Sequence, residues 1–209
     1  ATTTTDENGA YLFEGLPIGK DYTVEVTDIN NVLKDLVPTY AADGEVNNLD
    51  TNGNFEQNFG YTPKGQVDKT GNPTDKGLIG DRIWFDINGD GEQDDGEPGI
   101  RGVLVELYDD ENNLITTTVT DGNGNYWFGG LEDGNYTVVV DTTTLPNGGD
   151  NMTNTGDPDG GGDSESLVTI TGGETNLDQD FGYKVADDYA NKISGTIWED
   201  RNADGTLNA

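Results

Sequence analysis

The stretch IWFDINGDGEQDDGEPGIRGVLVELYD, residues 83–109, carries the patterns that decide the fold of this chain. It opens inside a β-branched and aromatic run over 78–86. It closes in a run over 102–110, where Val103, Val105 and Leu107 alternate with other side chains. Alternation with a period of two places those three side chains on one face of a β-strand. An acidic, glycine-containing loop separates the two runs, so the stretch predicts strand, loop and strand.

Similar runs follow over 135–141, 166–173 and 177–183. The side chains expected on one face of each strand are Tyr136, Val138, Val140, Val168, Ile170, Leu177, Gln179, Phe181 and Tyr183. No stretch keeps the 3.6-residue apolar period of an amphipathic helix. Short strands separated by Gly, Asn and Asp turns predict an all-β fold, an antiparallel β-sandwich of about seven strands of the Ig-like or prealbumin-like kind.

The chain also repeats itself. The matching segments are TDENGAYLFEGLPIGKDYTVEV (5–26) with TDGNGNYWFGGLEDGNYTVVV (120–140), NFGYT (58–62) with DFGYK (180–184), and ISGTIWEDRNADG (193–205) with IGDRIWFDINGDG (79–91). Self-similarity at a fixed spacing is the sequence signature of tandem repeats. The spacing of the matches predicts sandwich units of about 110–120 residues.

These matches predict the domain organisation. The expected parts are 1–63 as the C-terminal part of a preceding sandwich repeat, 64–76 as a linker, 77–184 as the complete repeat, 185–191 as a second linker, and 192–209 as the first strand and partial loop of a following repeat. Both linkers are polar and rich in turn-forming residues. The expected partners are therefore neighbouring repeats of the same protein.

Two interpretations of the incomplete end units remain open. The simpler one is that the chain is a segment of a long tandem array. The other is head-to-tail assembly, in which residues 192–209 of one subunit complete residues 1–63 of the next by strand addition. Against the second, the strand equivalent to 100–108 is absent from both pieces.

The charge limits the possible partners. The chain has 209 residues, with 41 acidic against 10 basic side chains and a net charge of −31. Such a chain repels nucleic acid and anionic lipid, and it also repels itself when compact. It has no Cys and therefore no disulfide cross-links, and no targeting or membrane-inserting segment is visible. Divalent cations are the expected means of offsetting the repulsion.

The acidic loop at 86–97, DINGDGEQDDGE, matches the twelve-residue calcium-loop pattern D-x-[DN]-x-[DN]-G-x5-E at every defined position. The predicted Ca²⁺ ligands are Asp86, Asn88, Asp90, Glu92, Asp94 and Glu97. Alternate side chains at positions 1, 3 and 5 turn inward, position 7 offers its carbonyl, and the final Glu closes the cage with two oxygens. Flanking helices are not required, because two strands can also hold the loop ends at a fixed separation.

Further calcium sites are predicted from weaker patterns. The loop 154–166 offers Asp157, Asp159 and Asp163. The TDGNG turn offers Asp121 and Asn123, and Asp141 stands at a strand end. In such turns Asp and Asn are also favoured because they bond their own backbone, so a purely structural role stays open there. A truncated copy of the calcium loop offers Asp200, Asn202 and Asp204.

The combination of IWFDINGDGEQDDGEPGIRGVLVELYD, TDGNGNYWFGGLEDGNYTV and the closing DFGY resembles the B-type domain of serine–aspartate repeat surface proteins of Gram-positive bacteria, related to Cna-B-type folds. The resemblance covers nearly all of 77–184 and both partial units. It implies a β-sandwich with several structural calcium ions, serving as a stalk at the cell surface. It also implies an extracellular location, at the cell surface or in a surface filament.

The resulting hypothesis is a non-catalytic extracellular structural protein, whose calcium-rigidified modules form a stiff stalk or filament. The chain has no His, no Cys and no G-x-S-x-G motif, so it is not expected to be an enzyme. One alternative is an adhesin whose modules bind a host or matrix ligand directly. Another is an accessory module of a secreted carbohydrate-active protein.

Overall fold

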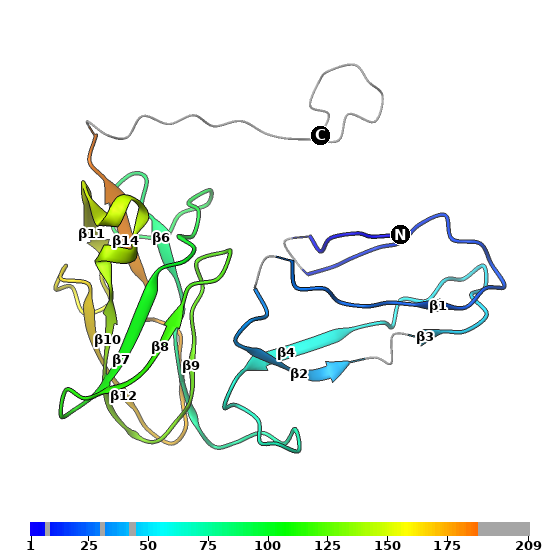
Figure 1. Cartoon of the computed structure of the whole chain (residues 1–209), viewed down its shortest axis with the longest axis horizontal. Coiled ribbons are helices and arrows are strands. Elements are labelled where there is room, and N and C mark those ends of the chain that lie inside the picture. Colours follow the sequence, from blue (N-terminus) through cyan, green and yellow to red (C-terminus); the bar gives the residue numbers. More distant parts are fainter. Residues whose placement is uncertain (7–8, 30–31, 42–44, 188–209) are drawn as a thin grey trace.

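The computed structural model describes residues 1–6, 9–29, 32–41 and 45–187 (Figure 1). Within these ranges the regular structure consists of fourteen β-strands and two short 3₁₀ helices, Thr142–Thr144 and Pro146–Gly149. The prediction of an all-β fold is confirmed. None of the helices in the described ranges has the length and apolar character needed to span a membrane.

The domain after residue 76 is built from three sheets. The largest has the strand order β12-β10-β7-β8 and is antiparallel throughout; its strands are β7 (Leu104–Asp109), β8 (Leu114–Val119), β10 (Gly134–Val140) and β12 (Glu165–Ile170). The second has the order β11-β14-β6, from β6 (Ile83–Phe85), β11 (Met152–Gly156) and β14 (Phe181–Val185). The third has the order β13-β5-β9, from β5 (Gly77–Ile79), β9 (Phe128–Leu131) and β13 (Thr175–Asn176).

One continuous hydrophobic core joins these sheets. It combines Val105, Leu107 and Val138 from the four-stranded sheet with Ile83 and Phe181 from the facing strands. All five side chains are 0% exposed. Burying an aliphatic or aromatic side chain of this size stabilises the fold by about 1.5–3 kcal/mol. The period-2 pattern therefore predicted the inner face of the large sheet correctly.

The last predicted strand differs from the expectation. Phe181 and Tyr183 are buried in β14, but Leu177 is 43% exposed, because β13 ends at Asn176 and the chain is irregular before β14 begins. Moreover β14 runs parallel to β6, and β13 runs parallel to β5. Parallel neighbours come from distant parts of the chain, so a local alternation pattern carries no information about their direction.

Strands β8, β9 and β11 were not predicted. Strand β8 lies at the edge of the four-stranded sheet, and its first four residues are exposed. An edge strand that is solvated on both faces has no apolar–polar alternation to detect. Strand β9 contains two adjacent glycines, which weaken the strand signal.

Residues 1–63 form two small strand pairs. Strand β1 (Tyr22–Thr23) pairs with β3 (Glu45–Val46), and β2 (Leu36–Ala41) pairs with β4 (Phe59–Pro63). The core of the larger domain contains none of the described residues of this segment. The division of the chain into partial and complete repeats remains a prediction.

Candidate metal centre

The loop 86–97 has both of its ends tied down by backbone hydrogen bonds. The Phe85 N–H donates to the Pro98 carbonyl at 2.9 Å, and the Ile100 N–H donates to the Ile83 carbonyl at 2.8 Å. The Asp86 N–H donates to the Tyr183 carbonyl of β14 at 3.0 Å. Strand β6 and the returning chain thus hold the loop ends at a fixed separation, without a flanking helix.

The first and last acidic residues of the loop are its buried ones. Asp86 is 1% exposed and Glu97 is 7% exposed. The Asp86 carboxylate accepts hydrogen bonds from the Gly89 and Gly91 N–H groups at 2.5 and 2.8 Å. The Glu97 carboxylate accepts from the Ile87 N–H at 2.6 Å with one oxygen and from the Asp94 N–H at 3.2 Å with the other. These two carboxylates therefore organise the loop backbone around themselves.

The middle of the loop brings three more predicted ligands together. The Asn88 amide group donates to the Asp90 and Asp94 carboxylates, both at 2.8 Å. The Asn88 carbonyl oxygen accepts from the Asp90 N–H at 2.9 Å, and Asp90 in turn accepts from the Glu92 N–H at 2.9 Å. The Glu92 side chain is exposed, which agrees with a predicted contribution through its backbone carbonyl only.

Gly91, at position 6 of the loop, meets two structural demands. Its φ of +82° lies in the left-handed region, which glycine enters without steric cost. A β-carbon at this position would also lie 2.7 Å from the Thr155 carbonyl oxygen of β11. The loop therefore packs with its backbone directly against the end of β11, from which the next acidic loop starts.

Burial alone would raise the pKa of Asp86, but the Thr155 side chain and the N–H groups of Gly91 and Gly89 together outweigh this effect and leave its pKa below the ordinary value. Donors aimed at a carboxylate favour its charged form. Asp86 is accordingly an anion at neutral pH although its side chain is buried. Such an anion is a ligand ready for a hard cation.

The second predicted cluster, Asp157, Asp159 and Asp163, lies between β11 and β12. Each of the three residues offers a carboxylate oxygen, and these oxygens lie within 4.8 Å of one another. Two oxygens on opposite sides of a calcium ion, each about 2.4 Å from the ion, would also be about 4.8 Å apart. Among the described residues this is the one group of three acidic side chains gathered so closely.

Asp157 is the most enclosed member of this cluster. Its Oδ2 accepts from the Ser164 N–H at 3.2 Å, whereas its Oδ1 is buried and has no hydrogen-bond partner among the described residues. Burial raises the pKa of Asp157, and the neighbouring Asp159 carboxyl raises it further. A buried acceptor without a donor, next to other carboxylates, is an environment that a cation would stabilise.

The donor sets of the two loops fit a hard cation. They offer oxygen atoms from carboxylate, amide and backbone carbonyl groups, and no nitrogen or sulfur ligand, since the chain lacks His and Cys. Oxygen-only sets suit Ca²⁺ and Mg²⁺ rather than zinc or copper. The first loop also packs against the residue immediately before Asp157, because a β-carbon at Gly156, the last residue of β11, would lie 3.0 Å from the Gly91 carbonyl oxygen.

The TDGNG turn is linked to the end of the first loop through the Arg82 side chain. The Asp121 carboxylate accepts from the Asn123 and Asn125 N–H groups at 2.8 and 2.9 Å. The Arg82 guanidinium donates to the Asn123 carbonyl at 3.2 Å and to the Glu97 carbonyl at 3.4 Å. Both carboxylate and backbone of this turn therefore have local structural roles, and a metal at Asp121 and Asn123 stays a prediction.

Asp141 belongs to no close group of three acidic side chains among the described residues. Asp141 caps the first 3₁₀ helix, accepting from the Thr143 N–H at 3.0 Å and from the Thr143 hydroxyl at 2.6 Å. Asp200, Asn202 and Asp204 lie outside the described residues. A calcium site at any of these positions likewise stays a prediction.

One acidic pair, Asp81 and Asp180, has no signal in the sequence. Burial raises the pKa of Asp180 to about 6, although its carboxylate accepts from the Arg82 N–H at 2.8 Å. Burial also raises the pKa of the neighbouring Asp81. These residues match no metal-loop spacing, and only the return of β14 alongside β6 brings them together.

The family model of the SdrD B-like domain matches residues 77–183. The chain belongs to the SdrD B-like domain family. It is 38% identical over 217 aligned residues to serine-aspartate repeat-containing protein F of Staphylococcus epidermidis (strain ATCC 12228 / FDA PCI 1200), an alignment that covers 98% of this chain and 12% of that protein. It is 34% identical to serine-aspartate repeat-containing protein D of Staphylococcus aureus (strain Newman), over 96% of this chain and 15% of that protein.

Both relatives are much longer than this chain, which spans only 12% and 15% of their lengths. Among solved structures, the minor pilin GBS52 of Streptococcus agalactiae is 18% identical with a TM-score of 0.37, over 57% of this chain and 48% of that chain. The match to the SdrD B-like domain confirms the resemblance from which the sequence analysis drew its hypothesis.

Proposed function

We propose that this chain is a non-catalytic structural segment of an extracellular surface protein, in which bound calcium stiffens each SdrD B-like domain. The observation that carries the proposal is the loop 86–97, with its ends tied between β6 and the returning chain and its two buried carboxylates at positions 1 and 12. Membership of the SdrD B-like family supports a domain that serves within a long protein at the cell surface.

The proposed ligands follow from the positions of the side chains in the loop. Asp86, Asn88 and Asp90 would coordinate with side-chain oxygens and Glu92 with its backbone carbonyl. Asp94 would bind directly or through water, and Glu97 would supply two oxygens. The Asn88 amide group now spans Asp90 and Asp94. A cation would replace that bridge, so Asn88 would turn its carbonyl oxygen inward.

Electrostatics gives the cation a structural task. The loop carries six acidic residues among twelve. Each close pair of like charges costs about 1 kcal/mol in water and more in the protein. A cation that binds the folded domain and not the unfolded chain adds about 2.7 kcal/mol of stability at a concentration 100 times its dissociation constant. Calcium could therefore stabilise a domain that has no disulfide.

A second ion is proposed at Asp157, Asp159 and Asp163. The support is the close approach of the three carboxylates and the unpartnered oxygen of Asp157. Because the end of β11, immediately before Asp157, packs against Gly91 of the first loop, ordering one loop should make binding at the other more favourable. The two sites would then behave as a coupled pair.

A second candidate function, ligand binding by an adhesin, has one observation in its favour. A row of partly apolar side chains crosses the outer face of the four-stranded sheet. Leu167 pairs with Thr137, Thr137 with Tyr108, and Tyr108 with Leu114. Leu167 is 72% exposed and Leu114 is 52% exposed. An exposed apolar row of this kind is a feature of binding surfaces.

Calorimetric titration of the full chain with calcium chloride tests the leading proposal. We expect heat of binding from the wild-type chain, and loss of one class of sites in the variant Asp86→Asn. Asp95→Asn is the matched control, because it removes one charge from an exposed position of the same loop that is not a ligand in the motif. Equal titrations for both variants and the wild type would exclude the loop as a calcium site.

A further inference from the structure

The segment that joins residues 1–63 to the SdrD B-like domain is folded. Within the expected linker 64–76, Val67 and Pro73 form a β-bridge, and the Thr74 N–H donates to the Gln66 carbonyl at 2.9 Å. The Gln66 side-chain amide donates to the carbonyl oxygens of Lys76 and Gly77 at 3.3 and 3.0 Å. The segment is therefore a closed hairpin anchored at the start of β5, and not a loose tether.

The base of this hairpin makes an unusually close backbone contact with β9. A β-carbon at Gly129 would lie 2.2 Å from the Lys64 carbonyl oxygen. A β-carbon at Gly65 would lie 2.6 Å from the backbone nitrogen and Cα of Gly130. Real β-carbons do not approach other atoms so closely. The segment 64–66 and strand β9 can therefore lie together only because both have glycine at the contact.

The contact, and not the backbone conformation, explains the glycine at position 129. Its φ lies outside the left-handed region, so any residue could adopt its conformation. In the matching segment of the first copy, FEGL at 13–16 aligned with FGGL at 128–131, the same place is held by Glu14. Gly129 is therefore not demanded by the repeat motif, but it is demanded by the neighbouring segment.

The docked segment is rigidly connected to residues 1–63. Strand β4 ends at Pro63, immediately before it, and pairs with β2. The Lys64 N–H continues that ladder by donating to the Asp35 carbonyl at 3.0 Å. The Lys64 side chain donates to the Lys34 carbonyl at 2.9 Å and to the Asp35 carboxylate at 3.0 Å. A change at the docking point must therefore turn the β2–β4 pair as well.

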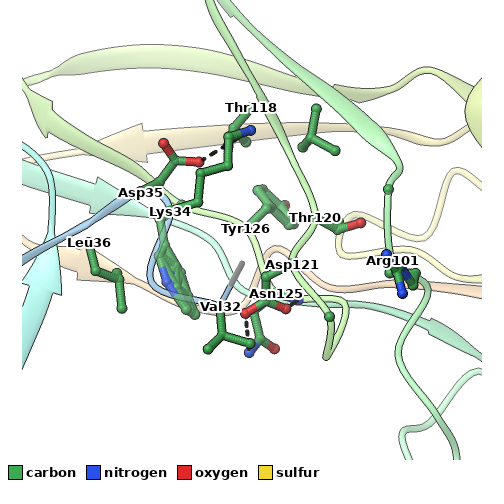
Figure 2. Close-up of a pocket in the computed structure, with 14 residues that line it drawn as sticks. Val32, Lys34, Asp35, Leu36, Arg101, Thr118, Thr120, Asp121, Asn125 and Tyr126 are labelled. Atoms are coloured by element: carbon green, nitrogen blue, oxygen red, sulfur yellow. Dashed lines mark hydrogen bonds and ion pairs between the residues drawn. The ribbon is translucent and has the colours of Figure 1, made fainter. Parts of the chain in front are cut away.

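Two clefts flank this contact. A cleft of about 190 Å³ lies between the turn at 32–36 and the residues 118–127 of the domain. Figure 2 shows Lys34, Asp35 and Leu36 on one side of it and Thr118, Thr120 and Tyr126 around the other. A second cleft of about 160 Å³ lies between Pro63–Lys64 and residues 116–118. The glycine contact is thus the tight point of the junction.

We infer that Gly129 and Gly130 form a docking point for the backbone of the preceding segment, residues 64–66, and so fix the angle between residues 1–63 and the SdrD B-like domain. This inference rests on the proposed stalk function for its biological meaning, because a stalk needs stiff junctions as well as stiff domains. No residue of the docking point belongs to the loops 86–97 or 157–163. The junction is therefore stiff without a cation.

Distance measurements between two spin labels test the inference directly. The chain has no Cys, so Thr51→Cys and Glu111→Cys, both at exposed positions, place one label on each side of the junction. In the full chain with the wild-type glycines we expect one narrow distance distribution. Gly129→Ala should broaden it at least about two-fold, because the added methyl group meets the Lys64 carbonyl.

Gly134→Ala is the matched control. A β-carbon at Gly134 would meet only the Tyr136 ring, at 3.8–3.9 Å, which is an ordinary contact. Its distribution should superpose on that of the wild type, and the thermal midpoints of both variants should show that the domain is folded. Gln66→Ala, which releases the hairpin from Lys76 and Gly77, should broaden the distribution without adding any atom at the contact with β9.

The inference is overturned if Gly129→Ala keeps the wild-type distribution, or if the wild type is already as broad as the variant. A distribution that is narrow with calcium and broad with EDTA would also overturn it, since the junction would then depend on the cation. Failure of the proposed calcium function would be seen separately. The wild-type chain would then give no heat of calcium binding, while its distribution of spin-label distances stayed narrow.

Discussion

Replacing Glu97 by Gln should remove most of the stability that calcium confers. Glu97 is 7% exposed, and its two oxygens accept the N–H groups of Ile87 and Asp94. Gln keeps one acceptor oxygen, so one loop amide loses its partner at a cost of about 1–3 kcal/mol in the metal-free chain. Removing one of six acidic charges returns about 1 kcal/mol of that cost. The metal-free variant should therefore be only slightly less stable than the wild type.

The difference should become large when calcium is present. At 100 times its dissociation constant, calcium adds about 2.7 kcal/mol to the wild type, or about 10–20 °C in the midpoint of a domain of this size. If the loss of a charged, two-oxygen ligand weakens binding about 100-fold, the gain falls to about 0.4 kcal/mol. Calcium should then raise the midpoint of the Glu97→Gln variant by about 2–3 °C.

Differential scanning calorimetry of the wild type, Glu97→Gln and Asp95→Asn, each in calcium and in EDTA, measures both effects. Asp95→Asn should respond to calcium as the wild type does, because Asp95 is exposed and stands outside the ligand positions. A calcium shift in Glu97→Gln equal to that of the wild type would refute the assignment of the loop. A shift lost equally in both variants would show that loop charge matters and that ligand geometry does not.

Three further outcomes follow from the packing and the charges. Burial raises the pKa of Asp180 to about 6, so the folded chain holds a proton that the unfolded chain releases, and stability falls as the pH rises from about 4 to 6. Asp180→Asn should therefore raise the free energy of urea unfolding by about 1 kcal/mol at pH 7 and change it little at pH 4. An equal effect at the two pH values would contradict this role of Asp180. Because Asp159 raises the pKa of Asp157, Asp159→Asn should lower that pKa, which ¹³C NMR titration of the carboxyl in EDTA can follow. Leu107→Ala, at 0% exposed, should cost about 2–5 kcal/mol in chemical unfolding, whereas Leu167→Ala, at 72% exposed, should stay within about 0.5 kcal/mol.

The core of the large sheet was predictable because its strands are half-buried. In β7, β10 and β12 every second side chain enters the core, and most of the apolar residues follow that period, although Leu167 of β12 lies on the outer face. Strand β8 was not predictable, since its first four residues are exposed on both faces. The parallel pairing of β14 with β6 was not predictable either, because it joins segments about a hundred residues apart.

The first candidate loop could be recognised from the sequence, because its predicted ligands lie within twelve residues and their spacing reflects local geometry. The second was found as three acidic residues in a glycine-rich loop, but its most telling feature, the unpartnered oxygen of Asp157, arises from packing. The Asp81–Asp180 pair had no sequence signal. Its raised pKa values come from burial that only the folded chain creates.

The sequence by itself determined the all-β fold, the apolar face of each half-buried strand and the spacing of the proposed oxygen ligands, because all of these depend on residues near one another along the chain. The tertiary structure decided which loops meet and which segments dock. The contact of Gly91 with Thr155 and that of Gly129 with Lys64 join distant residues through their backbones. Backbone contacts leave no mark on the sequence except a glycine, and a glycine alone does not tell what it touches.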